Sequence, residues 1–194
     1  SITDIGELAS IESLRTLNIN SNYILTIPDF SKTNLTDLYL SGNMITDLSP
    51  LANIDSLSHI DVGDNFISSI ESFKDNENIN FFSINNNCIM DYEVIAYNAS
   101  MIKALEEGSQ ISYADCVATN QRAKEIVKDI MDLSESEKER YIYQYVLDNV
   151  EYEIVSGPMV PFGYTGLMTG KGVCGDYAEV FCLLAVSAGL ECYV

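Results

Sequence analysis

A cysteine stands at the junction between an irregular segment and an apolar, helix-like stretch. Residues 156–172 are rich in glycine and proline, and a helical periodicity begins near Cys174. The first turn of a helix lies at the positive end of the macrodipole, which favours the nucleophilic thiolate form of a cysteine. The backbone N–H of Cys174 has no acceptor within the helix and can point at a developing oxyanion. This position predicts that Cys174 is a nucleophile. A buried cysteine with a purely structural role would explain the same residues equally well.

The residues around this cysteine are predicted to shape a groove or an oxyanion site. Gly172 allows close approach of the backbone, and Gly175 leaves room beside the sulfur. We expect Asp176 and Glu179 on the solvent side of the helix, with a place in the groove as the alternative. Tyr177 is expected to shape the groove, and the alternative is that it is simply a core residue. The candidates for groove and oxyanion site are Gly172, Gly175, Asp176, Tyr177 and Tyr164.

Several regular elements must position this segment. The sequence predicts helices over 119–132, 134–149 and 174–188, and extended segments over 109–114, 150–154 and 191–194. The second helix opens with Ser134-x-x-Glu137, which is a capping box. The third ends at Gly189, and Cys174 is expected to head its apolar stripe.

The segment 119–194 resembles the amino-terminal part of a transglutaminase-like core domain. The resemblance rests on the Gly-Val-Cys-Gly-Asp-Tyr-Ala box at 172–178, the preceding helix and the trailing Ala-Gly-Leu. This family belongs to the papain-like Cys-His-Asp enzymes, which implies that Cys174 is the nucleophile. The resemblance places the family's His and Asp on strands after this helix, beyond Val194. We therefore expect a fragment whose nucleophile is not activated.

The residue after the cysteine bears on the branch of the family. Many animal members have tryptophan there, whereas this chain has Gly175 and contains no tryptophan. In this respect the chain is similar to the microbial branch. The resemblance leaves both protease-like hydrolysis and amide cross-linking open.

The first half of the chain is a repeat. The frame L-x-x-L-x-L-x-x-N-x-I occurs in four copies that begin at Leu14, Leu35, Leu57 and Ile79. Its L-x-L part predicts a short strand with two inward apolar side chains, and its Asn amide can satisfy backbone groups at a buried turn. The copies resemble leucine-rich repeats of the short bacterial, internalin-like kind. Residues 92–107 are predicted to close the solenoid as a helical cap.

Strand residues outside the repeat frame are predicted to form a concave surface. The candidates for binding a protein partner there are Arg15, Asn18, Asp37, Tyr39, His59, Asp61 and Phe81. Leucine-rich solenoids often bind proteins, but an ordinary solvated face explains the same residues. The single histidine, His59, has no cysteine or histidine at ligand spacing. We therefore expect it to be a surface residue and not a metal ligand.

The composition argues against several kinds of partner. The 194 residues include 10 basic and 29 acidic side chains, for a net charge of −19. Such a charge disfavours nucleic acid and anionic membrane surfaces. No uncharged apolar stretch reaches the about 18 residues that a transmembrane helix needs. The five cysteines contain no C-x-x-C pair, so no metal site, disulfide framework or cofactor is predicted.

These expectations combine into an α+β protein. The repeats and their cap are assigned to 1–108, a connector to 109–118 and a partial transglutaminase-like domain to 119–194. The leading hypothesis is a bacterial surface or secreted protein whose repeats choose a protein substrate for acyl transfer through Cys174. The alternative is a non-enzymatic adhesion module with a degenerate transglutaminase-like domain.

Overall fold

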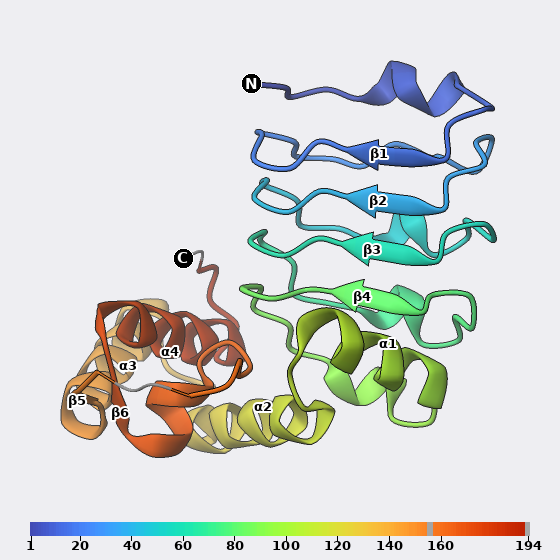
Figure 1. Ribbon diagram of the computed structural model, residues 1–194. Helices are drawn as coiled ribbons and strands as arrows, with labels where there is room; N and C mark the ends of the chain where they lie inside the picture. The colour runs from blue at the N-terminus through green and yellow to red at the C-terminus, as the bar shows by residue number, and fades with distance from the viewer. Residues whose placement is uncertain (155–156, 193–194) are drawn as a thin grey trace. The chain divides into compact units, whose positions relative to one another are not determined.

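Strands and helices are segregated along the chain (Figure 1). The computed structural model describes residues 1–154 and 157–192. The chain divides into two units, Ser1–Gln110 and Ile111–Val194. The first unit is built on short parallel strands and the second is mainly helical. The predicted α+β class is therefore confirmed.

The first unit stacks one strand per repeat (Figure 1). The strands are β1 (Thr16–Asn18), β2 (Asp37–Tyr39), β3 (His59–Asp61) and β4 (Phe81–Ser83). They form one parallel sheet in chain order, and its register aligns the central residues Leu17, Leu38, Ile60 and Phe82. All four central side chains are buried. Neighbouring repeats thus build a continuous core that no single repeat could form.

The asparagine of each repeat frame joins neighbouring repeats. The amide oxygens of Asn43, Asn65 and Asn87 each accept a backbone N–H of the preceding repeat at 2.9–3.0 Å. The Nδ2 of Asn65 donates to the carbonyls of Leu40 and Val62, both at 3.0 Å. The three asparagines are buried. The predicted role at buried turns is confirmed for these three copies, because each amide uses both its donor and its acceptor, whereas Asn22 of the first copy is only half-buried.

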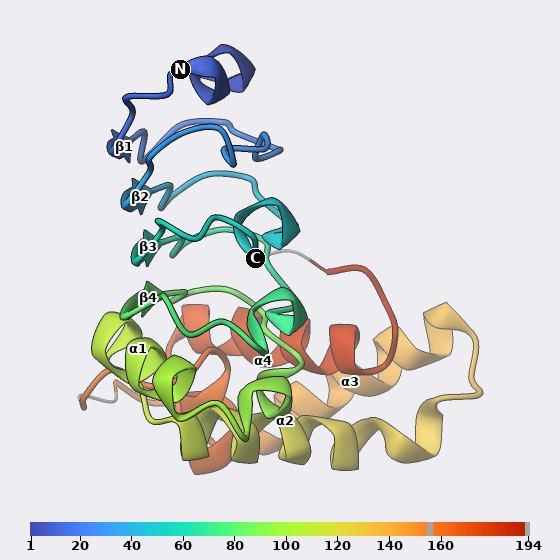
Figure 2. The same cartoon turned by 90° about the vertical axis from the view of Figure 1, so that its right-hand side faces the viewer.

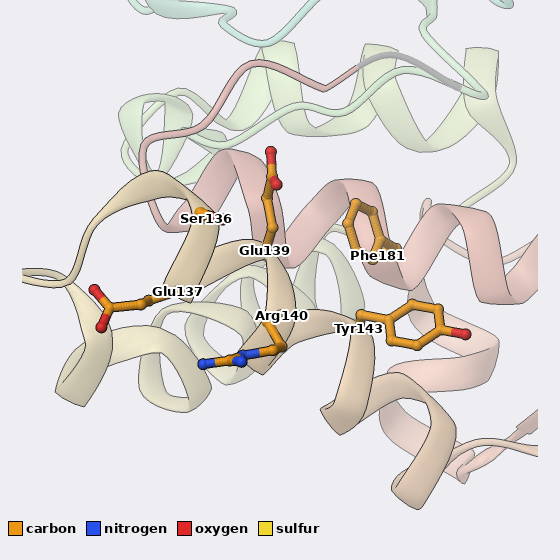
Figure 3. Close-up of a pocket in the computed structure, with 6 residues that line it drawn as sticks. All are labelled: Ser136, Glu137, Glu139, Arg140, Tyr143 and Phe181. Atoms are coloured by element: carbon orange, nitrogen blue, oxygen red, sulfur yellow. The ribbon is translucent and has the colours of Figure 1, made fainter.

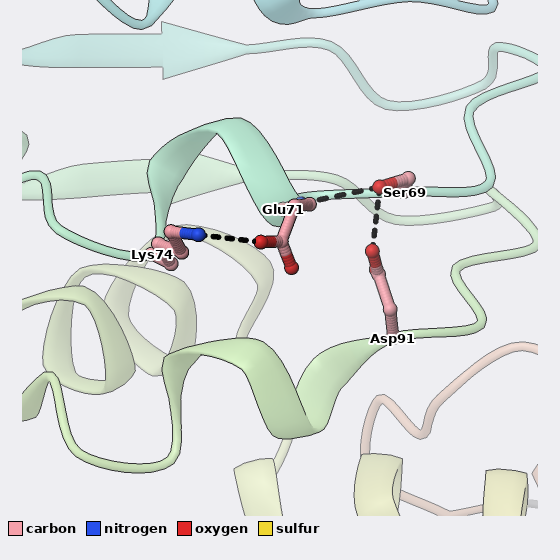
Figure 4. A network of polar contacts seen from close by, with 4 residues as sticks. All are labelled: Ser69, Glu71, Lys74 and Asp91. Atoms are coloured by element: carbon pink, nitrogen blue, oxygen red, sulfur yellow. Dashed lines mark hydrogen bonds and ion pairs between the residues drawn. The ribbon is translucent and has the colours of Figure 1, made fainter.

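Short 3-10 helices lie on the side of the first unit opposite the strands (Figure 2). They are η1 (Gly6–Ser10), η2 (Ser49–Leu51), η3 (Glu71–Phe73) and η4 (Tyr92–Ile95). Around η3 the carboxylate of Asp91 accepts from the Ser69 hydroxyl at 2.5 Å (Figure 4). It also accepts from the Ile70 N–H at 2.9 Å. Glu71 pairs with Lys74 at 2.8 Å. The network ties η3 to the segment just before η4.

Helix α1 (Ala99–Ser109) packs beside β4 and ends the repeat sheet. Its Gly108 lies so close to the chain of Phe82 that a Cβ atom would fall 2.3 Å from the backbone carbon. The Ser109 hydroxyl accepts from the Ile84 N–H at 3.0 Å and donates to the Phe82 carbonyl at 3.1 Å. The serine thus satisfies backbone groups that another strand would otherwise pair. As predicted, the segment after the last repeat is helical.

The predicted strand at 109–114 is wrong. Ser109 ends α1, Gln110 adopts a left-handed conformation with φ of 56°, and helix α2 begins at Tyr113. The side chain of Ser112 caps α2 by accepting the backbone N–H of Asp115. This cap starts the helix six residues before the predicted residue 119.

Three long helices and two short strands dominate the second unit (Figure 1). The elements are α2 (Tyr113–Val127), η5 (Lys128–Ile130), α3 (Glu135–Asn149), β5 (Glu151–Tyr152), the π-helical turn η6 (Thr165–Thr169), β6 (Lys171–Gly172) and α4 (Cys174–Ser187). Ser134 and Glu137 form the predicted capping box. Glu191 and Cys192 adopt no regular structure, contrary to the predicted strand, and residues 193–194 lie outside the described residues.

Candidate active site

Cys174 is the first residue of α4 and is exposed. The residue before it, Val173, is extended, with φ of −98° and ψ of −177°, and the helix begins at once. The backbone N–H groups of Cys174 and Gly175 fall in the first turn, where no acceptor exists within the helix. The expectation that Cys174 heads the buried stripe of the helix is wrong, because Cys174 is exposed and the buried side chains of α4 begin at Val180. The thiol therefore faces solvent beside amide donors that have no acceptor within the helix.

Asp176 fixes this first turn. Its Oδ2 accepts the backbone N–H of Val173 at 2.8 Å, so it caps α4. Its side chain also lies directly over Gly172, where an added Cβ would sit 2.4 Å from the Asp176 Cβ. The expectation that Asp176 faces solvent is therefore wrong, and the residue is half-buried. Gly172 is needed because the aspartate occupies the space of a side chain.

Two tyrosines attach α4 to the short strand pair. The Tyr177 hydroxyl donates to the Val150 carbonyl at 2.6 Å. Tyr152 pairs in register with Gly172 in the parallel β5–β6 ladder, and the rings of Tyr152 and Tyr177 are 6.5 Å apart. Gly175 is open, since a Cβ there would meet no atom within 4 Å apart from its chain neighbours and the backbone of its own helix. Tyr177 thus serves packing, and Gly175 leaves space next to the cysteine.

A half-buried carboxylate holds the loop before the cysteine. Glu179 Oε2 accepts the Gly163 N–H at 2.9 Å. Gly163 has φ of 75° and is pressed against Leu183. Burial raises the pKa of the Glu179 carboxyl, an effect that the Gly163 N–H opposes. The candidate Tyr164 lies half-buried at the start of η6, on the same loop. Glu179 is therefore not on the solvent side as expected.

An open hollow of about 480 Å³ lies between α3 and α4 (Figure 3). Its lining residues are Ser136, Glu137, Glu139, Arg140, Tyr143 and Phe181. Cys174 and the five predicted groove residues do not line it. Phe181 lies about two turns further along α4 than the cysteine. The hollow is thus a feature separate from the candidate nucleophile.

The predicted partner face carries a row of rings. His59 stacks on Phe81 with ring centroids 3.9 Å apart and planes within 5° of parallel. The ring of Tyr39 lies 5.2 Å from His59. Asp37 and Asp61 lie on the same strands and are half-buried, whereas the candidates Arg15 and Asn18 are exposed. His59 is thus half-buried on this face, with its ring packed against Phe81 and close to Tyr39.

The remaining cysteines serve other roles. Cys182 is buried in α4, and its Sγ lies 3.3 Å from the Cys192 carbonyl. Cys116 is buried and Cys88 half-buried. Within residues 1–154 and 157–192, no cluster of three or more His, Cys, Asp or Glu side chains could hold a metal ion. In the same residues, no helix is long and apolar enough to cross a membrane.

Sequence reasoning missed two features of these sites. The first is the contact of Asp176 with Gly172, whose signal is an aspartate three residues after the N-cap position. The second is the ring row, whose signal is the spacing of Tyr39, His59 and Phe81 by about one repeat. In both cases the residue types were visible, but their contacts required the helix start and the sheet register.

Two segments match known families. Residues 33–75 match the leucine-rich repeats (2 copies), and residues 120–194 match the transglutaminase-like superfamily. The protein thus joins leucine-rich repeats to a transglutaminase-like segment.

The chain is also similar to a solved structure of a leucine-rich-repeat protein. An internalin from Listeria monocytogenes matches with 23% identity and a TM-score of 0.43, over 61% of this chain and 42% of that chain. This chain therefore spans less than half the length of that internalin. No curated protein matches.

Proposed function

We propose that this protein acts on protein amides by acyl transfer through Cys174, and that its repeat unit selects the protein. One observation carries the proposal. An exposed thiol is the first residue of α4, inside the segment that matches the transglutaminase-like superfamily. Exposure gives access to a substrate carbonyl, and the helix start supplies N–H donors that have no acceptor within the helix.

The reaction proceeds in two halves. The thiolate of Cys174 attacks the amide carbonyl carbon, a C–S bond forms, and one carbonyl electron pair moves to oxygen. The N–H groups in the first turn of α4 can donate to this oxyanion. When the oxyanion collapses, the C–N bond breaks and the amine leaves with a proton from a general acid. Water or a second amine then attacks the thioester, the C–S bond breaks, and the thiol is restored. Water gives hydrolysis, and an amine gives a cross-link.

The reaction also needs a group that acts as general acid and base. The only histidine of the sequence is His59, and its ring stacks on Phe81 in the repeat unit. We assign it no part in acyl transfer. We propose that a histidine of another segment or another chain completes the site. Without such a group the protein would be the non-enzymatic binding module.

We place the protein at the cell surface or outside the cell. The repeat type and the net charge of −19 support this placement. Protease treatment of intact cells, followed by immunodetection, tests it. Loss of the protein signal, with a cytoplasmic marker intact, is the expected result. Protection of the protein until the cells are lysed would contradict the placement.

The activity test uses the complete protein that carries this chain. Casein is the substrate, and ammonia release, peptide-bond cleavage and incorporation of monodansylcadaverine are measured. We expect Cys174→Ala to abolish whichever activity the wild type shows. The matched control is Cys88→Ala, because Cys88 is half-buried in the repeat unit and outside the site. Equal rates in wild type and Cys174→Ala would overturn the proposal. A wild type that is inactive on all three measures would favour the binding module.

A further inference from the structure

The concave face of the repeat sheet carries a continuous row of three rings. In the sheet register His59 lies between Asp37 of β2 and Phe81 of β4. His59 and Phe81 meet face to face, and Tyr39 tilts at 49° against His59. All three residues are only half-buried. Because the stacked faces cover each other, the ring edges remain for a ligand. Partly exposed rigid rings are typical of residues that dominate protein interfaces.

Two carboxylates flank this row. Asp61 pairs in register with Tyr39, and Asp37 pairs with His59. Asp37 Oδ2 accepts the Thr36 hydroxyl at 2.6 Å, and Asp61 Oδ1 accepts the Gly63 N–H at 3.2 Å. Within the described ranges neither carboxylate has an ion-pair partner. Each carboxylate therefore keeps acceptor capacity for a cation from outside.

We propose that this face binds a protein segment with a lysine or arginine next to an apolar side chain. The inference rests on the proposed selection of a protein by the repeat unit. The aliphatic stem of the cationic side chain would lie along the ring edges, and its head group would reach Asp37 or Asp61. Charge complementarity supports this partner, because the chain has a net charge of −19. The same charge repels acidic peptides and nucleic acid.

The test titrates the whole chain with short synthetic peptides. Each peptide has a central Lys, Arg, Glu or Ala, flanked on both sides by Leu or by Ser. Amide chemical shifts of the isotopically labelled protein report both the affinity and the location. We expect the Leu-Lys-Leu and Leu-Arg-Leu peptides to bind at least tenfold more tightly than their Glu and Ala counterparts. The shifts should centre on β2, β3 and β4.

Variants separate this recognition from general attraction between charges. The double variant Asp37→Asn/Asp61→Asn and the single variant Phe81→Ala should each weaken Leu-Lys-Leu binding about tenfold. The matched control is Asp55→Asn/Asp75→Asn, which removes the same charge at exposed positions outside the sheet and should leave binding unchanged. Equal weakening by both double variants, or no preference for the cationic peptides, would overturn the inference.

Failure here is distinguishable from failure of the proposed chemistry. Cys174→Ala lies in the other unit and should leave peptide binding unchanged. Conversely, Asp37→Asn/Asp61→Asn should leave alkylation of the Cys174 thiol by iodoacetamide unchanged. A protein that binds no cationic peptide but still transfers acyl groups through Cys174 would refute only the recognition.

Discussion

The Cys174 thiol is positioned by Asp176, the residue two positions later in the same helical turn. Asp176 holds the Val173 N–H at 2.8 Å and fills the space above Gly172. These two contacts fix the direction in which the chain enters α4. Because the thiol itself is exposed, its position depends on this backbone geometry more than on packing of the sulfur.

The two glycines that flank the cysteine should respond differently to the same substitution. Gly172→Ala forces a methyl group against Asp176, and we expect it to lower the free energy of unfolding by about 2 kcal/mol. Gly175→Ala is the matched control, since its Cβ meets nothing within 4 Å and alanine favours helices. Denaturant unfolding of both variants checks this. Similar losses in the two variants would contradict the assigned role of Asp176.

The Glu179 carboxyl should make the free energy of unfolding depend on pH. Burial raises its folded pKa above the ordinary value of 4.5, so the folded state binds its proton more tightly than the unfolded state does. Its contribution to stability is therefore fully present below the unfolded pKa and is lost as pH rises through the folded pKa. Glu179→Gln should remove this loss while keeping an acceptor for the Gly163 N–H.

Unfolding measured from pH 4 to 8 tests the role of Glu179. The difference in stability between Glu179→Gln and wild type should shift in favour of the variant as pH rises above 4.5. Glu135→Gln, an exposed carboxylate in the first turn of α3, serves as the control. A difference between Glu179→Gln and wild type that stays constant across this range would contradict the raised pKa.

At the scale of elements, each repeat turn uses one left-handed residue. Ser21, Gly42, Asp64 and Asn86 have φ of 57°, 69°, 53° and 53°, and each precedes a frame asparagine. Only Gly42 adopts this conformation without steric cost. The repeat therefore stores backbone strain at the same place in three of its four copies.

Replacing one strained residue should stabilise the first unit. Ser21→Gly should raise the free energy of unfolding by about 1 kcal/mol, because glycine accepts the left-handed conformation. Ser13→Gly should bring no gain, since Ser13 is exposed and does not have a positive φ. Thermal unfolding compares the two. Equal effects would mean that the backbone at Ser21 is not strained.

The packing of helix α1 against β4 depends on the hydroxyl of Ser109. Ser109→Ala leaves the buried Ile84 N–H without its acceptor, and we expect a loss of about 2 kcal/mol. Ser100→Ala, at an exposed position of the same helix, should change stability little. Amide hydrogen exchange at Ile84 gives a local readout, which should speed up only in Ser109→Ala. Unchanged exchange at Ile84 would contradict the role of the serine.

The repeats were predictable because their signal is local and recurs. Leu38, Ile60 and Phe82 follow from the same frame, and the structure buries all three. The segment at 109–114 was predicted wrongly, since the side chain of Ser112 caps a helix that begins there. The cysteine at a helix start was likewise visible in the sequence. The neighbours that hold it come from β5, β6 and the loop at 161–170, which only the folded chain brings together.

For the whole molecule, charge dominates behaviour in solution. The net charge is −19, and the ion pairs Glu71–Lys74, Lys103–Glu107, Glu125–Lys128 and Glu153–Lys171 are exposed. Added salt should therefore screen the repulsion between the acidic side chains more than the attraction within these ion pairs. We expect the melting temperature to rise by a few degrees between about 10 mM and about 500 mM NaCl. A melting temperature that falls over this range would show that attractive pairs outweigh the repulsion.

Trapping the acyl-enzyme tests most directly whether the Cys174 thiol is the nucleophile. The complete protein is mixed with a glutamine-containing peptide, quenched in acid within the first turnover, digested and analysed by mass spectrometry. We predict an acyl adduct on the peptide that contains Cys174, removable by hydroxylamine and absent from Cys174→Ala. Turnover of the glutamine peptide with no adduct on Cys174, or with an adduct on a different residue, would contradict the claim that this thiol is the nucleophile.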